Sequence, residues 1–441
     1  MVFQTITFTL FFGLVFFWMK NTASIIPRAH SFIFWSLVFY GWMNPWISLY
    51  LLAYAVVTSY AGANSQKPYV ATIHIVGSLL LLTLAKYLNW GLSWLEIAPW
   101  WPSWAVPAAL SFITFQGVWA VAQSKRGEVG DISISDRLAH VCFFPSLSSG
   151  PITSLSHWMA NKELASIPIH EGIYRIGLGL FQKLVLSGIA NQITTVTFAD
   201  PTLMNTSALW LGAFAYTIEI YADFAGYSNM AIGVALLLGV RLPENFQYPY
   251  IAQNIQDFWR RWHMSLSTFF RDNLYIHLLG GNRVSPTRRW VNALMVMLIC
   301  GLWHGANSTF VVWGLLHGVA LVIVYKWSAS VKLPKVFSMA LTWLFIVYTW
   351  IWFRADSFEQ AIQYQQGLLG SDGFTQMAFE WWVFIGLALF IIFTESRWSP
   401  KLLSILQRYS WVVLSVFSCV GMAIILLLSP RGLPNFIYYQ F

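Results

Sequence analysis

Charged residues are scarce in this chain of 441 residues. Asp, Glu, Lys and Arg make up only 10% of it, whereas 57% of the residues are hydrophobic and 18% are aromatic. Outside one arginine-rich region, the longest hydrophilic strip runs from Arg354 to Glu380, which is too short to fold as a soluble domain. The scarcity of charge argues against a soluble enzyme, and we expect a single membrane-embedded domain over residues 1–441.

Cysteine is scarce as well. The three cysteines, Cys142, Cys300 and Cys419, are far apart and lie in apolar surroundings. An odd number at these spacings predicts neither a disulfide framework nor a metal site. Cys300 precedes His304 by one helical turn, and we expect it to act as a small buried core residue.

The N-terminus lacks a basic leader. The first basic residue is Lys20, which follows the apolar run Thr5–Met19, whereas a secretory signal peptide carries its positive charge before its apolar region. We therefore interpret this run as a retained first membrane span.

Long apolar runs are what the sequence has in abundance. We count about eleven to thirteen candidate membrane segments, and some are shorter than the roughly 20 residues that a straight span needs. Short segments predict broken or re-entrant helices inside a protein-lined cavity. The predicted fold class is an all-α polytopic membrane protein, with clear runs at 5–19, 70–84, 336–353, 381–393 and 411–428.

Two apolar regions carry interruptions. Residues 138–153 contain Pro145, Gly150 and Pro151, which predict a bent or re-entrant element in place of a continuous helix. Residues 208–240 are long enough for two short spans, and a polar stretch with Glu219 and Asp223 lies at their centre.

Glu219 and Asp223 are four residues apart, so a helix places them on one face. One interpretation is that they pair with basic residues and hold helices together. The other is that they form the polar wall of a substrate tunnel, because carboxylates inside a membrane are usually functional.

Half of the formal net charge of +8 lies between Asp257 and Trp290, where six arginines face two aspartates. The positive-inside tendency predicts that this segment faces the cytoplasm. Its beginning reads DFWRRWHMSLSTFFRD (257–272). If this stretch is helical, His263 shares an apolar stripe with Trp259, Leu266 and Phe270.

The next stretch of interest is GLWHGAN (301–307). Gly301 and Gly305 form a pair of small residues that lets another backbone approach closely. The pattern recurs thirteen residues later as GLLHG, which contains His317. On one continuous helix this spacing corresponds to a rotation of about 220°, so His304 and His317 would face different ways. We expect one to be catalytic and the other to have a packing role.

These stretches and several others together resemble the membrane-bound O-acyltransferase (MBOAT) family, in particular its bacterial branch of alginate O-acetyltransferases and D-alanyl transfer proteins. The resemblance covers nearly the whole chain. It rests on LVFYGWMNPW (37–46), FFPSLSSGPI (143–152), YADFAGYSNMAIG (221–233), LPENFQYPY (242–250), DFWRRWHMSLSTFFRD (257–272), GGNR (280–283), GLWHGANSTFVVWGLLHG (301–318), FRADSF (353–358) and FIYYQF (436–441), with the motif core at about 208–318.

The resemblance implies a ring of helices around a central tunnel, with an acyl thioester arriving from the cytoplasm and a hydroxyl acceptor from outside. It also implies that His304 is the catalytic histidine and that His263 faces it. The sequence departs from the acetyltransferase pattern at Gln182, Glu219 and Asn229, where that pattern has lysine, glutamine and aspartate. These departures leave the acyl group and the acceptor open.

Transfer of an acyl group from a thioester to an alcohol needs a base for the hydroxyl proton and a donor for the developing oxyanion. A buried neutral histidine suits the first need, and His304 is our choice. His263 either polarises the thioester carbonyl or holds the acceptor hydroxyl. Asn307 either orients the His304 imidazole or makes a plain interhelical hydrogen bond. Trp303, Asp223 and Asp272 complete the supporting candidates.

The arginines have two interpretations. Arginine suits bidentate contacts with the phosphates of coenzyme A or of a phosphopantetheine arm, so Arg260, Arg261 and Arg271 are donor-binding candidates. Alternatively they form structural ion pairs, such as one between Asp257 and Arg261, or extend to lipid headgroups.

We therefore predict an O-acyltransferase of the bacterial plasma (inner) membrane that acetylates an envelope or exported polysaccharide. The predicted co-substrate is an acyl thioester, either acetyl-CoA or an acyl carrier protein, and no permanently bound cofactor or metal is expected. Because no serine-hydrolase motif is present, we expect a relay transferase as partner, besides membrane lipids, and no nucleic acid. D-alanyl transfer to a teichoic-acid-like acceptor is the alternative, and a polysaccharide or lipid transporter is a distant one.

Overall fold

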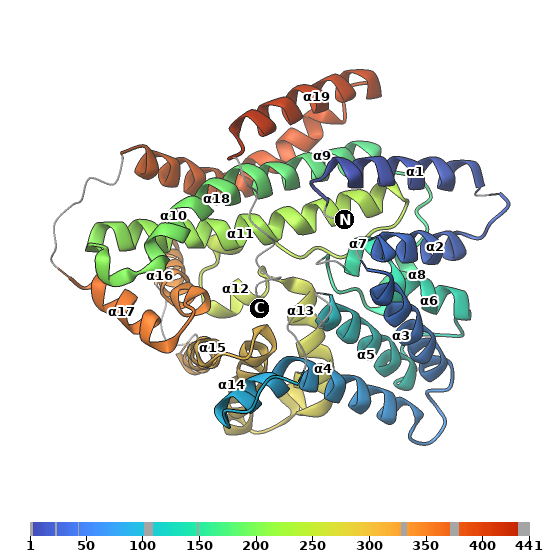
Figure 1. Cartoon of the computed structure of the whole chain (residues 1–441), viewed down its shortest axis with the longest axis horizontal. Helices are drawn as coiled ribbons and strands as arrows, with labels where there is room; N and C mark the ends of the chain where they lie inside the picture. The colour runs from blue at the N-terminus through green and yellow to red at the C-terminus, as the bar shows by residue number, and fades with distance from the viewer. Residues whose placement is uncertain are drawn as a thin grey trace. The chain divides into compact units, whose positions relative to one another are not determined.

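The computed structural model describes residues 3–22, 24–42, 44–100, 109–147, 150–327, 333–370 and 379–430. Throughout these ranges the regular secondary structure is helical, which confirms the all-α prediction (Figure 1). The FIYYQF motif at 436–441 lies outside the described residues.

Six of the described helical segments are long and apolar enough to cross a membrane. Ile6–Thr22 and Val413–Leu428 are apolar but shorter. Most of the other described helices are short, as the short apolar runs in the sequence predict, whereas Thr206–Leu237 has 32 residues and Pro286–His304 has 19. The six segments are Pro45–Ala63, Val70–Trp94, Ile169–Ala199, Ser308–Lys326, Lys335–Arg354 and Phe379–Leu406.

The chain divides into two compact units. The first comprises Met1–Ile176 and Tyr227–Glu244, and the second comprises Gly177–Gly226 and Asn245–Phe441. Helix α11 (Thr206–Leu237) and the helical segment Ile169–Ala199 each continue from one unit into the other. The single domain expected over residues 1–441 stays a prediction.

The first unit begins with the N-terminal helices and ends with the last turns of α11. Its helices are α1 (Ile6–Thr22), α2 (Arg28–Gly41), α3 (Pro45–Ala63), α4 (Val70–Trp94), α5 (Leu110–Lys125), α6 (Ile134–Cys142), α7 (Phe144–Leu147), α8 (Leu155–Asn161) and the start of α9 (Ile169–Leu180). Helix α3 packs against both α5 and α6, as Figure 1 also shows.

A bent element occurs where the prolines predict it. Helix α6 ends at Cys142, and the short α7 follows. Buried side chains bind the irregular backbone beyond it: the His140 Nε2 lies 2.8 Å from the carbonyl oxygen of Thr153, and Gln116 Oε1 accepts a hydrogen bond of 3.5 Å from the Thr153 N–H. These side-chain partners satisfy backbone groups that would otherwise be costly to bury.

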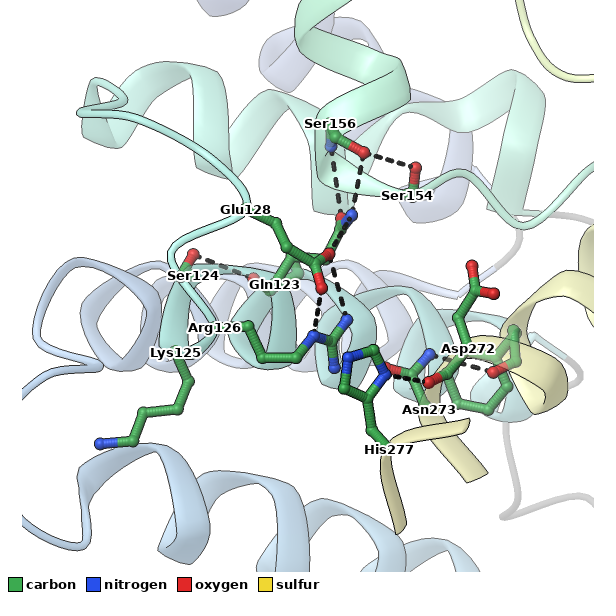
Figure 2. A network of polar contacts seen from close by, with 12 residues as sticks. Gln123, Ser124, Lys125, Arg126, Glu128, Ser154, Ser156, Asp272, Asn273 and His277 are labelled. Carbon is green, nitrogen blue, oxygen red and sulfur yellow. Dashed lines mark hydrogen bonds and ion pairs between the residues drawn. The ribbon is translucent and has the colours of Figure 1, made fainter. Parts of the chain in front are cut away.

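A polar network joins α5 to the start of α8 (Figure 2). The amide of Gln123 donates to Glu128 over 3.1 Å and to Ser156 Oγ over 2.9 Å, and its oxygen accepts from the Ser156 backbone N–H. Arg126 pairs with Glu128. The opposite charges of Arg126 and Glu128 therefore pair within the first unit.

The second unit contains most of the motif core. Its helices are the π-helical segment η2 (Phe181–Ser187), α10 (Gly188–Ala199), most of α11 (Thr206–Leu237), α12 (Ile255–Trp259), α13 (Met264–Phe269), the π-helical segment η5 (Phe270–Leu278), α14 (Pro286–His304), α15 (Ser308–Trp327), α16 (Lys335–Arg354), α17 (Phe358–Leu368), α18 (Phe379–Leu406) and α19 (Trp411–Leu428), with 3-10 turns η3 (Pro201–Leu203), η4 (Pro249–Ile251) and η6 (Gly281–Arg283).

Helix α11 is continuous over 32 residues, so the prediction of two short spans within 208–240 is wrong. The polar centre does not break the helix because side chains from η2 and α10 bind its carboxylates. Lys183 forms an ion pair with Asp223, and Asn191 donates to Glu219 over 2.8 Å. Partnered carboxylates can stay inside an apolar helix without unwinding it.

The two GLxHG copies lie on different helices, so the rotation argument for one continuous helix is wrong. Helix α14 ends at His304, and α15 begins at Ser308. Asn307 caps the N-terminus of α15, because its Oδ1 accepts from the Thr309 N–H over 3.1 Å. The two helices pack as a hairpin.

Gly301 and Gly314 explain how closely α14 and α15 approach. A Cβ at Gly301 would clash with the carbonyl oxygen of Phe310, and a Cβ at Gly314 would lie 2.5 Å from that of Met297. The close backbone approach predicted for Gly301 is confirmed.

Candidate active site

His263 lies at a break between α12 and α13. Helix α12 ends at Trp259, and His263 has φ 42° and ψ 54°, a left-handed conformation that is uncommon for any residue except glycine. The predicted stripe on one continuous helix is therefore wrong. Because of this break, the direction of the His263 side chain does not follow the helical period of α12 or α13.

Asn245 holds this break in place. Its backbone carbonyl accepts from the Met264 N–H over 2.9 Å. Its side-chain Oδ1 lies 3.0 Å from Nδ1 of His263, and it accepts from Oγ of Ser265 over 2.9 Å and from the Ser265 N–H over 3.3 Å. All three groups are buried, Asn245 completely. Asn245 belongs to the motif LPENFQYPY (242–250), but the sequence alone predicted no role for this residue.

His304 occupies the last position of α14 and is buried among aromatic rings. Its ring centroid lies 4.8 Å from that of Trp303, 5.1 Å from that of Trp313 and 4.8 Å from that of Phe353. Its contacts with Trp313 and Phe353 are edge-on. These rings fix the position of the imidazole at the helix end.

Trp303 contacts both histidines. The centroid of its indole lies 6.2 Å from that of His263 and 4.8 Å from that of His304. Phe224 of α11 also contacts the His263 ring. The two ring centroids lie 4.6 Å apart, with an interplanar angle of 82°. The two histidines predicted as catalytic thus belong to one aromatic cluster of the second unit.

His317 has a different environment. Its Nδ1 accepts a hydrogen bond of 3.2 Å from the Trp259 indole N–H, and its Nε2 lies 3.1 Å from the hydroxyl of Thr349. Both ring nitrogens are therefore engaged by protein groups. This arrangement is typical of a histidine that holds helices together.

A cavity of about 640 Å³ lies in the second unit next to these elements. Arg260, Arg271 and Arg289 line it together with polar and apolar side chains. Met264, which follows His263, is also part of its lining, as is Cys300, one turn before His304. The cavity therefore combines three guanidinium groups with residues adjacent to both histidines.

The remaining arginine candidate does not line this cavity. Arg261 forms an ion pair of 2.8 Å with Asp257 and donates to the carbonyl oxygen of Gln247. Arg289, by contrast, is part of the lining, although no sequence motif distinguishes it from the other five arginines. Only its position in the same arginine-rich segment indicated that Arg289 could contribute to a donor site.

Asp272 and Asn307 both bind other protein groups. Asp272 forms an ion pair of 2.7 Å with Arg271. Its backbone carbonyl accepts from the His277 ring (Figure 2). Asn307 caps α15 and donates to the carbonyl oxygen of Asp356 over 2.9 Å. The supporting role expected for both residues stays a prediction.

The carboxylates of α11 form a buried polar group with η2, α10 and α18. Besides the Lys183–Asp223 pair, Tyr221 donates to Glu395 over 2.7 Å, and Gln182 donates to Glu395 over 3.3 Å. Asp223 also accepts from Ser187. Lys183 is a partner that sequence reasoning missed.

Two of the departures from the acetyltransferase pattern are thus part of this group, namely Gln182 and Glu219. The third, Asn229, lies in the first unit and accepts a hydrogen bond of 2.8 Å from Arg175. Within the described ranges, no cluster of His, Cys, Asp and Glu could hold a metal ion.

Comparison with known proteins agrees with the motifs. The sequence profile of the membrane-bound O-acyltransferase family matches residues 29–358. The peptidoglycan O-acetyltransferase of Helicobacter pylori is 32% identical over 388 residues, which cover 77% of this chain and 73% of that protein. The probable alginate O-acetylase AlgI of Azotobacter vinelandii is 34% identical over 385 residues, with 82% and 75% covered.

A more distant relative is the teichoic acid D-alanyltransferase of Bacillus subtilis, which is 27% identical over 274 residues that cover 57% of this chain and 69% of that protein. The family profile spans more than half of the chain, and its span includes both histidines, the arginine-lined cavity and most of the described helices. The chain belongs to the membrane-bound O-acyltransferase family and is a multi-pass membrane O-acyltransferase.

Proposed function

We propose that this enzyme moves an acyl group, with acetyl as the leading choice, from a cytoplasmic thioester to an extracytoplasmic hydroxyl acceptor. The observation that carries the proposal is the shared contact of His263 and His304 with Trp303, beside a cavity that three arginines line. This arrangement supplies a base, a second polar group and an anion-binding entrance within one unit.

In the proposed reaction, the acceptor hydroxyl gives its proton to the His304 imidazole while its oxygen bonds to the thioester carbonyl carbon. The tetrahedral intermediate then loses the carbon–sulfur bond. The departing thiolate takes the proton from the His304 imidazolium, so no net proton is released. General-base catalysis of this kind typically contributes about a hundred- to ten-thousandfold.

The aromatic cluster favours this role for His304. The rings of Trp303, Trp313 and Phe353, with centroids 4.8 to 5.1 Å from that of His304, shield the imidazole and the reacting groups from water. His263 either polarises the thioester carbonyl or holds the acceptor hydroxyl. Either role places it on the same transition state as His304.

The cavity supports binding of a phosphate-bearing donor. Arg260, Arg271 and Arg289 offer guanidinium groups that match phosphate oxygens, and acetyl-CoA or an acyl carrier protein would bring such phosphates. The acyl thioester is a co-substrate in this proposal, and no permanently bound cofactor or metal is needed.

The proposed setting is the bacterial plasma (inner) membrane, with an envelope or exported polysaccharide as the final acceptor. Relatives that act on peptidoglycan and alginate support this choice. The sequence carries no serine-hydrolase motif, so we propose that the enzyme passes the acyl group to a separate relay transferase. D-alanyl transfer is the second candidate, supported by the D-alanyltransferase relative.

Reconstituted proteoliposomes test the donor and the relay together. We expect acetyl-CoA consumption that stalls with polysaccharide alone and resumes when a relay transferase is added outside. Complete acetylation of the polymer by the purified enzyme alone would contradict the relay. Turnover with a D-alanyl carrier protein but not with acetyl-CoA would replace the leading proposal by the second candidate.

Membrane orientation is tested separately. Thr287 is exposed at the start of α14 and lies in the arginine-rich segment. In a Thr287→Cys variant on a background lacking the native cysteines, an impermeant thiol reagent should label the protein only after the cells are opened. Labelling in intact spheroplasts would show that the arginine-rich segment faces the outside of the cell, which would contradict a cytoplasmic donor site.

A further inference from the structure

The strongest feature outside the proposed chemistry is the clamp that Asn245 makes around His263. We infer that Asn245 is a positioning residue that fixes the tautomer of His263, so that His263 accepts a hydrogen bond from the acceptor hydroxyl and does not polarise the thioester carbonyl. The inference rests on the proposed function and decides between the two roles left open for His263.

The orientation of the Asn245 amide follows from its partners. The backbone N–H of Ser265 can only donate, and it lies 3.3 Å from the atom assigned as Oδ1 of Asn245. Ser265 Oγ and His263 Nδ1 approach the same atom, at 2.9 and 3.0 Å. An amide oxygen accepts from all three groups, whereas an amide nitrogen could not accept from the Ser265 N–H.

The tautomer of His263 follows in turn. Since Asn245 Oδ1 accepts, Nδ1 of His263 must carry the hydrogen, and in a neutral imidazole the other nitrogen, Nε2, is then an acceptor. Burial lowers the pKa of His263, so the neutral ring is the stable form. An acceptor at Nε2 can bind a hydroxyl proton but cannot donate to a carbonyl oxygen.

The clamp is rigid as well as specific. Asn245 is fully buried and its main chain is also bound, because its carbonyl accepts from the Met264 N–H over 2.9 Å. His263 itself has the left-handed backbone conformation, which a non-glycine residue keeps only where its surroundings hold it. The strained residue and its tautomer are therefore held by the same amide.

Aromatic rings pack against the His263 imidazole. The elements packed on His263 present Phe224 of α11 and Trp303 of α14. The titratable groups next to these two residues are Asp223, which pairs with Lys183, and His304. A charge introduced at Asn245 would therefore act on His263 directly.

The test compares Asn245→Leu and Asn245→Asp by kcat, donor KM and pH profile. Leucine has the branched shape of asparagine, although it is larger, and cannot accept a hydrogen bond. Its kcat should fall by about 10²- to 10⁴-fold, the scale at which a wrong tautomer acts, with little change in donor KM. Aspartate can still accept and should restore most of kcat. Its negative charge should raise the pKa of His263 and move the acid limb of the profile to higher pH.

Asn292→Leu is the matched control, because Asn292 is equally buried in the second unit but donates to the carbonyl oxygen of Leu279. It should lower the melting temperature without moving the acid limb. Wild-type kcat in a folded Asn245→Leu variant, or an unmoved acid limb in Asn245→Asp, would overturn the inference. Activity in both His304→Ala and His263→Ala would instead overturn the proposed function itself.

Discussion

Lys183 and Asp223 form an ion pair whose side chains are almost completely buried in the second unit, with Lys183 on η2 and Asp223 on α11. Ser187 donates a further hydrogen bond of 3.3 Å to the same carboxylate. The pair explains how α11 carries a charged residue at its centre and remains a single helix.

Breaking this pair should be strongly destabilising. Removing one partner of a buried ion pair typically costs about 3 to 5 kcal/mol, because the remaining charge is left without compensation. We expect Lys183→Met to lower the melting temperature in detergent more than the double variant Lys183→Met with Asp223→Leu does. Equal or additive losses in the single and double variants would show that the pair does not hold η2 against α11.

The contact between α14 and α15 gives a second prediction. A methyl group at Gly314 would lie 2.5 Å from the Met297 carbonyl oxygen, which cannot move without shifting α14. Since α14 ends at His304, Gly314→Ala should lower both stability and kcat. Gly386→Ala in α18 is the matched control, because nothing lies within 4 Å of its added methyl group, and helix propensity alone should make it neutral or stabilising by up to about 1 kcal/mol. Similar behaviour of the two variants would contradict the close packing.

The arginine-lined cavity gives a third prediction. Arg260→Ala, Arg271→Ala and Arg289→Ala should each raise the KM for the thioester donor several-fold with a smaller effect on kcat. The effects should shrink at high salt, because Arg260 and Arg271 are exposed and screened. Arg288→Ala removes the same charge from the same segment but outside the cavity lining, and its donor KM should stay near that of the wild type. An equal rise of the donor KM in all four variants would indicate that only the overall positive charge of the segment matters and would contradict a binding site in the cavity.

Much of this arrangement follows from the sequence because it depends on local chemistry. Proline and glycine predict the bend after Cys142, and glycine spacing predicts the close approach at Gly301. The break at His263 does not follow, since the stretch around it has a regular helical period and the partner that stabilises the break, Asn245, lies in a separate segment. Lys183 was missed for the same reason. Pairings between distant segments depend on packing that periodicity does not encode.

The central claim is that His304 and His263 act on one transition state, and a double-mutant cycle tests it most directly. His304→Ala, His263→Ala, the double variant and His317→Ala should be compared as folded, membrane-inserted proteins by kcat/KM for the thioester donor. We expect His304→Ala to lose about a hundred- to ten-thousandfold, His263→Ala to be severely impaired, and the double variant to be little worse than His304→Ala, because groups that act as a unit show non-additive losses. His317→Ala should mainly lower stability, by about 1 to 3 kcal/mol, through its lost hydrogen bonds with Trp259 and Thr349. Three results would contradict the account. The double variant could lose the product of the two single losses, the His304→Ala enzyme could be active, or a folded His317→Ala enzyme could be less active than His304→Ala.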